Sequence, residues 1–190
     1  MRSFGFHRFL VAAATASSLL VGASSAALAD VWPSRSIKLI VPFPAGGAAD
    51  TIARIYSDKL SEALGQSIVV ENKAGAGTAI AADFVAKADP DGYTLSLAPA
   101  GQLTILPHVN TAINFDPFKS FAPVSLLASV PYVVAASPDA PVSNLKDLIA
   151  AAKKEPGKFT YSSCGLGTLC HLSGELFKSL TGTDLLHVPF

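Results

Sequence analysis

The sequence has little charge and no excess of either sign. Only 15% of its 190 residues are charged, and 14 basic side chains balance 14 acidic ones. A net charge near zero gives no electrostatic indication of binding to nucleic acid or to an acidic membrane surface. Because 50% of the residues are hydrophobic, the composition is typical of a globular protein and not of a disordered one. The length suits one domain or parts of two.

The sequence also lacks the common signatures of catalysis, nucleotide binding and metal binding. It has no G-x-G-x-x-G, no P-loop and no G-x-S-x-G. Cys164 with His171 suggests a cysteine nucleophile, and Ser162 or a neighbouring serine suggests a hydrolase. No acidic residue is placed by the sequence to orient the histidine, so we expect no enzyme. Four scattered histidines and two cysteines do not make a metal site, and we expect neither metal nor cofactor.

Long apolar runs are missing as well. The run from Phe9 to Val21 has about thirteen residues, whereas a membrane-spanning helix needs about 20. Arg2 and Arg8 flank its start, and Ala27-Leu28-Ala29 is an A-x-A cleavage site. We therefore predict a signal peptide over residues 1–29, cleaved after Ala29, and a mature protein in the periplasm.

The chain then presents a strand, a glycine loop and a helix. Ile37–Val41 is a β-branched run typical of a buried strand, and apolar residues recur at helical spacing over Ile52–Leu64, with Gly65 in the position of a helix C-cap. Gly46 and Gly47 would leave the amides at the start of the helix open to an anion. The sequence predicts a binding site for a small carboxylate at this loop, although a glycine loop of this kind is often only a tight turn.

The same alternation continues along the chain. Ser67–Val70 reads as a second strand, Glu71–Thr78 as a second glycine loop and Ala79–Ala88 as a helix that should be well buried, because it is apolar on nearly every face. Tyr93–Ala98 reads as a third strand. Consecutive units of this kind predict a parallel sheet with helices on its faces.

The middle of the chain is less regular. Residues 99–123 indicate an irregular, partly buried segment, whereas 124–128 and 132–136 resemble strands. We interpret this stretch as the passage from a first lobe, residues 30–123, to the start of a truncated second lobe, residues 124–190.

The second part of the chain repeats the opening pattern. Ser143 is a suitable N-cap for a helix over 144–154, with a buried apolar stripe. Phe159–Ser163 then reads as a strand, Cys164–Thr168 as a glycine loop and Leu169–Leu180 as an amphipathic helix that Gly182 closes.

Several sequence blocks, in one order, resemble the substrate-binding proteins of tripartite tricarboxylate transporters, the TctC or Bug family of solute receptors. The similarity runs from about Trp32 to the last residue. The blocks are Pro42-Phe43-Pro44-Ala45-Gly46-Gly47-x-x-Asp50, Val70 to Gly77, Ala88 to Leu95, Phe121 to Leu127, Gly165-x-Gly167-Thr168, His171-Leu172-x-Gly174-Glu175-Leu176-Phe177 and His187-Val188-Pro189-Phe190.

The resemblance implies an α/β fold of the type II periplasmic-binding-protein kind, with two lobes and mostly parallel sheets. It also implies a small organic acid, such as a dicarboxylate, a tricarboxylate or an acidic amino acid, held in the cleft and delivered to the transporter's membrane subunits. A sensing partner of a signalling system and a non-functional fragment are the alternatives. The ligand-binding residues that the resemblance implies are Phe43, Ala45, Gly46, Gly47, Asp50, Thr51, Gly75, Ala76, Gly77, Thr78, Ala100, Gly101, Ser162, Cys164, Gly167, Thr168 and His171.

Several of these residues have a simpler interpretation. Asp50 could pair with a cationic ligand group, but an acidic residue here more often caps a helix. Thr51 and Thr168 could each contact ligand or act as caps. His171 could meet a ligand carboxylate, or could pack against its neighbours and pair with Glu175, four residues later on the same helix face.

Two features concern the last part of the chain. Cys164 and Cys170 bracket the glycine loop, and they could form a disulfide or remain free thiols. Leu185–Val188 begins another strand, for which the sequence encodes neither the neighbour nor the covering helix that a parallel strand needs. Because the family's pattern continues beyond Phe190, we expect a C-terminally truncated member with an incomplete second lobe and no closed cleft.

Overall fold

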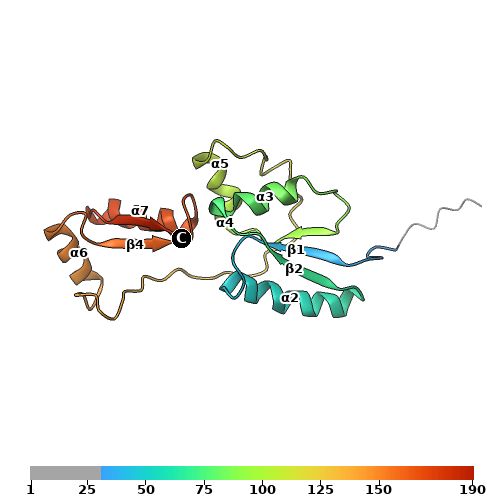
Figure 1. Ribbon diagram of the computed structural model, residues 1–190, viewed down its shortest axis with the longest axis horizontal. Coiled ribbons are helices and arrows are strands. Elements are labelled where there is room, and N and C mark those ends of the chain that lie inside the picture. The colour runs from blue at the N-terminus through green and yellow to red at the C-terminus, as the bar shows by residue number, and fades with distance from the viewer. Residues whose placement is uncertain (1–30) are drawn as a thin grey trace, which may run out of the picture. The chain divides into compact units, whose positions relative to one another are not determined.

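The computed structural model describes residues 31–190, so the predicted signal peptide lies outside the described residues. Arg35–Phe190 form one compact unit, which holds every helix and strand of the described chain. Its strands make two parallel sheets, in the orders β2-β1-β3 and β4-β5 (Figure 1). An α/β fold with parallel sheets is therefore confirmed.

The first sheet is built around β1 (Ile37–Val41), which is central and parallel to β2 (Ile68–Asn72) and β3 (Thr94–Ser96). Its apolar residues are buried on both faces, as expected for an inner strand of a parallel sheet. The helices α2 (Ala48–Leu64) and α3 (Ala79–Ala86) lie on opposite sides of this sheet (Figure 1).

Helix α2 contributes most of the core on its side of the sheet. Ala53 packs among Ile37, Leu39 and Val41, with Leu60 and Leu64 at the edge of that cluster. The helix ends where the sequence predicts, because Gly65 adopts the left-handed conformation (φ 66°) and its N–H bonds the carbonyl of Ser61.

Helix α3 is less buried than its composition predicts. Ala81 and Ala82 are buried, whereas Ile80 and Phe84 are exposed. The prediction of a well-buried helix was wrong, because a helix that is apolar all round still meets the sheet with only one face. A short 3₁₀ turn, Ala76–Thr78, precedes it.

The segment after β3 is more regular than expected. It holds two short helices, α4 (Ala100–Thr104) and α5 (Leu106–Val109), too short to show a helical period in sequence. Leu106 is buried with Ala82 and Phe115, which gives this segment its own small core. Our expectation of irregular structure over residues 99–123 was wrong at these two helices.

The strands expected at 124–128 and 132–136 are not formed. Both stretches are extended without a partner strand among the described residues, and most of their large apolar side chains are exposed. A strand needs a neighbour for its backbone hydrogen bonds, and β-branched composition alone does not supply one. A hydrogen bond connects the first of these stretches to α2, because the Tyr56 hydroxyl donates to the carbonyl of Leu127 at 2.6 Å.

Helix α6 (Leu145–Lys154) opens the second part of the fold, and its cap differs from the prediction. Asn144, not Ser143, is the N-cap, and its Oδ1 accepts the N–H of Asp147 at 3.0 Å. The expected buried stripe is also incomplete, since Ala152 is buried but Leu145 is exposed.

The second sheet pairs β4 (Thr160–Ser163) with β5 (Leu186–Pro189), and α7 (Leu169–Thr181) connects them. The expectation that the last strand has no neighbour was therefore wrong. Gly182 ends α7 in the left-handed conformation (φ 61°), as predicted. The apolar stripe of α7 is only partly covered, because Leu176 and Leu180 remain exposed.

Candidate functional site

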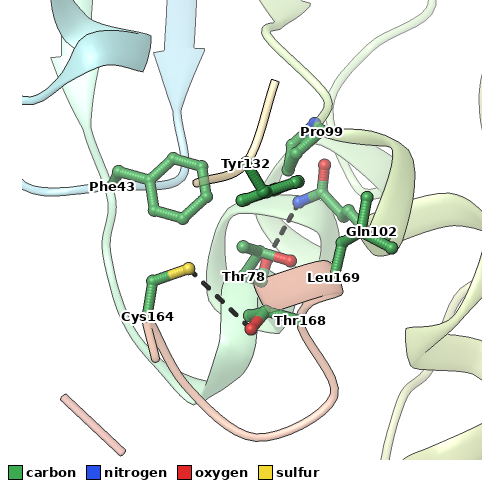
Figure 2. Close-up of a pocket in the computed structure, with 9 residues that line it drawn as sticks. Phe43, Thr78, Pro99, Gln102, Tyr132, Cys164, Thr168 and Leu169 are labelled. Atoms are coloured by element: carbon green, nitrogen blue, oxygen red, sulfur yellow. Dashed lines mark hydrogen bonds between the residues drawn. The ribbon is translucent and has the colours of Figure 1, made fainter. Parts of the chain in front are cut away.

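A small pocket lies where the loops after the strands meet (Figure 2). Its volume is about 260 Å³, including space open to solvent, and nine residues line it. Five of them were predicted from the sequence, namely Phe43, Thr78, Gly101, Cys164 and Thr168. The other four are Pro99, Gln102, Tyr132 and Leu169.

The remaining predicted residues do not line this pocket, and the sequence missed some that do. Gln102 lies in the stretch predicted to be irregular, and Tyr132 lies in a predicted strand, so no local signal identified either. The predicted residues outside the lining are Ala45, Gly46, Gly47, Asp50, Thr51, Gly75, Ala76, Gly77, Ala100, Ser162, Gly167 and His171.

Asp50 organises the first glycine loop from inside the protein. Its Oδ2 accepts the N–H of Gly46 and the Nε–H of Arg54, both at 2.9 Å, and its Oδ1 accepts Nη2 of Arg54 and Nδ2 of Asn72, both at 3.0 Å. Asn72 also donates to the carbonyl of Phe43 at 3.0 Å. Hydrogen bonds from Arg54, then from Gly46 and Asn72, hold the pKa of the Asp50 carboxyl well below its usual range.

This arrangement differs from both sequence interpretations of Asp50. The N-cap of α2 is Gly47, without a side-chain cap, and Asp50 lies inside the helix. Both carboxylate oxygens are already engaged within the protein. Asp50 therefore fixes the loop that carries Phe43, while the Thr51 hydroxyl donates to the Gly47 carbonyl at 3.1 Å.

Replacing Asp50 by asparagine should weaken the fold and flatten its acid sensitivity. An amide keeps one acceptor oxygen but turns an NH₂ toward groups that are themselves donors. Because the folded pKa is depressed, the carboxylate stabilises the protein above the unfolded value of about 3.9, and this contribution is lost as the pH falls below it. Asp50→Asn should lower the thermal midpoint by several degrees at pH 7 and less at pH 2.

Thermal unfolding between pH 7 and pH 2 measures this effect. Asp58→Asn is the matched control, since Asp58 lies on the same helix with its side chain exposed. A variant that loses as much stability between pH 4 and pH 2 as the native chain would contradict the assigned role of Asp50.

Thr78 is the unusual residue of the second glycine loop. It adopts a left-handed φ of 84°, rare for a β-branched residue, and it is only 3% exposed. Its carbonyl accepts Nε2 of the buried Gln102 at 2.9 Å (Figure 2). Its hydroxyl oxygen is buried and has no hydrogen-bond partner in the described chain. Backbone strain concentrates at functional sites, and an unpaired buried hydroxyl requires an explanation.

Thr168 faces the same pocket from the third glycine loop. It is the N-cap of α7, where its hydroxyl accepts the N–H of His171 at 3.4 Å and donates to the carbonyl of Gly165 at 2.6 Å. Thr168 therefore acts as a helix cap, which is one of its two sequence interpretations. Cys164 and Cys170 are joined by a disulfide across this loop, with Cα atoms 6.6 Å apart.

The second and third glycine loops meet through their backbones. A Cβ on Gly77 would collide with the carbonyl oxygen of Leu166, and a Cβ on Gly165 would lie 3.4 Å from the Cα of Gly77. A Cβ on Gly101 would come within 3.1 Å of the backbone nitrogen of Leu169. Glycine at these positions lets the loops close around the pocket.

A partly buried polar cluster lies behind the third loop. Ser163 Oγ and His187 Nε2 are 2.7 Å apart, and the rings of His187 and His171 stack with centroids 4.3 Å apart. The N–H of Gly167 donates to Nδ1 of His171 at 3.3 Å. His171 is therefore tied to the loop backbone.

Glu175 has partners other than the expected His171. It accepts the hydroxyl of Tyr161 at 2.6 Å and pairs with Lys178 at 3.1 Å. Burial, and then Glu175, raises the pKa of Tyr161, and the Tyr161 hydrogen bond lowers the pKa of Glu175. Gly174 makes room for this contact, because a Cβ there would collide with the Tyr161 ring.

Comparison with known proteins gives a consistent answer. Residues 52–190 match the family described as the tripartite tricarboxylate transporter family receptor, TctC. A UPF0065 protein of Bordetella pertussis is 43% identical over 173 residues, which cover 90% of this chain and 53% of the relative. The chain thus spans about half the length of this relative.

Solved structures agree in fold. A Rhodopseudomonas palustris protein solved with adipate is 39% identical with a TM-score of 0.81, and it is matched over 84% of this chain and 53% of its own. MatC from the same organism, solved with bound malate, is 32% identical with a TM-score of 0.78, over 84% of this chain and 54% of its own.

The fold is also that of the periplasmic binding protein BugD, which is 36% identical with a TM-score of 0.78, over 84% of this chain and 53% of its own. Within residues 31–190, no helix has the length and apolarity that crossing a membrane requires. The family match covers well over half of the chain, and it agrees with the parallel sheets and the glycine loops described above. The chain belongs to the TctC family of periplasmic solute-binding receptors.

Proposed function

We propose that this chain binds a small organic carboxylate in the pocket lined by Thr78 and Thr168, for delivery to the membrane subunits of a tripartite tricarboxylate transporter. The proposal includes export to the periplasm with signal cleavage after Ala29, and a first lobe (30–123) and the start of a second lobe (124–190) on either side of the ligand. Two related structures contain dicarboxylates, adipate and malate, which supports this ligand class.

The observation that carries the proposal is the Thr78 hydroxyl. An unpaired buried polar group costs about 1 to 3 kcal/mol, and a ligand that pairs with it recovers this cost. The hydroxyl belongs to a residue that lines the pocket, next to the Thr168 hydroxyl and the Gln102 amide (Figure 2). A carboxylate has two acceptor oxygens, and one of them can accept a hydrogen bond from the Thr78 hydroxyl.

The lining is suited to binding rather than to chemistry. Its polar groups are hydroxyls and an amide, without a charged side chain. The Ser163–His187 pair lies outside the lining, and Ser163 is only 8% exposed. We therefore propose capture without catalysis, in which the ligand favours the closed arrangement because it binds that arrangement better.

Thr78→Val tests this role directly. Valine has the shape of threonine and the same β-branching, so the left-handed backbone is strained in both, but the hydroxyl is gone. Losing one hydrogen bond to a charged ligand should weaken malate or adipate binding about tenfold or more, as measured by calorimetry.

Ser57→Ala is the matched control. Ser57 in α2 also has a buried hydroxyl without a partner in the described chain, but it does not line the pocket. Its removal should leave carboxylate affinity unchanged. Equal affinities of Thr78→Val and the native chain, or no binding of any small carboxylate, would refute the proposal.

A further inference from the structure

The walls of the pocket are largely hydrocarbon. Four of its nine lining residues have apolar or aromatic side chains, namely Phe43, Pro99, Tyr132 and Leu169. In Figure 2 the side chains of Phe43 and Tyr132 lie on one side of Thr78, and that of Thr168 lies on the other. A ligand that reaches the Thr78 hydroxyl can therefore place a hydrocarbon chain against the two aromatic rings.

The polar side chains of the lining are mostly engaged within the protein. The Thr168 hydroxyl donates to the carbonyl of Gly165 and accepts the N–H of His171. The Gln102 amide donates to the carbonyl of Thr78. The Thr78 hydroxyl has no hydrogen-bond partner in the described chain, although its residue is only 3% exposed. It is therefore the hydroxyl of the lining that is left for a ligand.

The sign of the ligand's charge follows from helix α7. Its N-cap, Thr168, and its first residue, Leu169, both line the pocket. The first amides of a helix have no partner inside the helix, and they carry the positive end of its dipole. Together with the Thr78 hydroxyl, which can donate, these amides favour a carboxylate and disfavour a cationic group in the same place.

A cationic group would also find no acidic partner in the lining. None of the described lining residues is an aspartate or a glutamate. Asp50 lies in the helix that follows the Phe43 loop, but its two oxygens already accept hydrogen bonds from Gly46, Arg54 and Asn72. Burying an ammonium group without an opposite charge is costly. An amino acid would meet this cost, whereas the corresponding acid without the amine would not.

We infer that this pocket selects a carboxylate with an unsubstituted hydrocarbon body over the amino acid of the same length. The inference rests on the proposed function, because it names the ligand class of the same site. It makes Tyr132 a specificity-determining residue, whose ring covers the hydrocarbon chain of the bound acid.

Three acids with one four-carbon skeleton test the selection. Succinate, malate and aspartate differ only in the group on C2, which carries an added hydroxyl in malate and an ammonium group in aspartate. At pH 7 their carboxylates are ionised and the aspartate amine is protonated. By calorimetry, succinate should bind the native chain at least tenfold more tightly than aspartate, with malate between them. Affinity for aspartate or malate that equals or exceeds that for succinate would overturn the inference.

Tyr132→Ala tests the hydrocarbon wall. Tyr132 is 57% exposed and lies in an extended stretch without a partner strand among the described residues, so its replacement should leave the thermal midpoint unchanged. Adipate has two more methylene groups than succinate, and each methylene that is buried strengthens binding severalfold. The native chain should therefore prefer adipate to succinate about tenfold, and Tyr132→Ala should reduce this preference to about twofold.

Val133→Ala is the matched control. Val133 is the next residue of the same stretch, it is 83% exposed, and it does not line the pocket. This variant should keep the native preference for adipate. A preference for adipate that Tyr132→Ala leaves unchanged would show that the ring does not cover the ligand, and would overturn the inference.

The same measurements separate this inference from the proposed function. If the native chain binds succinate, malate and aspartate equally, carboxylate capture stands and the selection fails. If it binds none of these acids, adipate included, the proposed function fails and the inference fails with it.

Discussion

Gly77→Ala should remove most carboxylate binding while lowering stability only modestly. Gly77 has a left-handed φ of 60°, and an added Cβ would collide with the carbonyl oxygen of Leu166 in the facing loop. Overpacking of this kind costs about 1 to 3 kcal/mol, and the loops can avoid it by moving apart. When the two loops move apart, the pocket between them opens. We therefore expect the ligand affinity to fall about tenfold to a hundredfold.

The control for Gly77→Ala is Gly65→Ala at the end of α2. Gly65 has nearly the same backbone conformation, φ 66°, but no atom lies within 4 Å of its added Cβ. In both variants an alanine in the left-handed conformation costs about 1 to 2 kcal/mol. Only in Gly77→Ala does the added Cβ also collide with another residue. Calorimetry with malate and urea unfolding should show similar stabilities and different affinities. Equal affinities would mean that contact between the two loops is not needed for binding.

The features predicted correctly from sequence are those that local interactions determine. The strand at Ile37–Val41 follows from its β-branched run, and the ends of α2 and α7 follow from Gly65 and Gly182, which accept a left-handed conformation. Their hydrogen bonds reach only four or five residues back along the chain. Such signals can be read without knowledge of the rest of the fold.

The features predicted wrongly depend on distant partners. Residues 124–136 have strand-like composition, but a strand forms only beside another strand, and no sequence window reports that. The reverse case is β5, which finds β4 as a neighbour through the register Tyr161↔His187. The identity of a strand's neighbour is a property of the whole fold.

The pocket residues also differ in whether local sequence or distant packing determines them. Glycine loops at the ends of strands could be found by pattern, and four lining residues come from them, whereas Gly101 came from the family resemblance alone. Gln102 and Tyr132 come from segments without a motif. The pairing of His171 with His187 is set by the packing of α7 against the second sheet, and their spacing in sequence does not predict it.

Opening the disulfide between Cys164 and Cys170 should have the other large effect. The bridge encloses Gly165–Leu169, and Cys164, Thr168 and Leu169 line the pocket. Closing a loop of this size in the unfolded chain is worth about 2 kcal/mol in the chain-entropy treatment. Reduction of the native chain should therefore lower its unfolding free energy by about that amount, and Cys164→Ser/Cys170→Ser should be equally destabilised and insensitive to reductant. An unchanged mass after alkylation without reductant would verify the bridge first.

The same loss should weaken binding by a separate route. Without the bridge, the loop's shape depends on the Thr168 hydroxyl, on the contacts of Gly165 to Ser163 and on the hydrogen bond of Gly167 to His171. Ordering a backbone residue costs about 1 to 2 kcal/mol, and a loosened loop must meet part of that cost when ligand binds. We expect malate affinity to fall about tenfold on reduction, at a temperature where the chain remains folded. If stability falls and affinity does not, the hydrogen bonds alone preorganise the loop, and the bridge serves folding only.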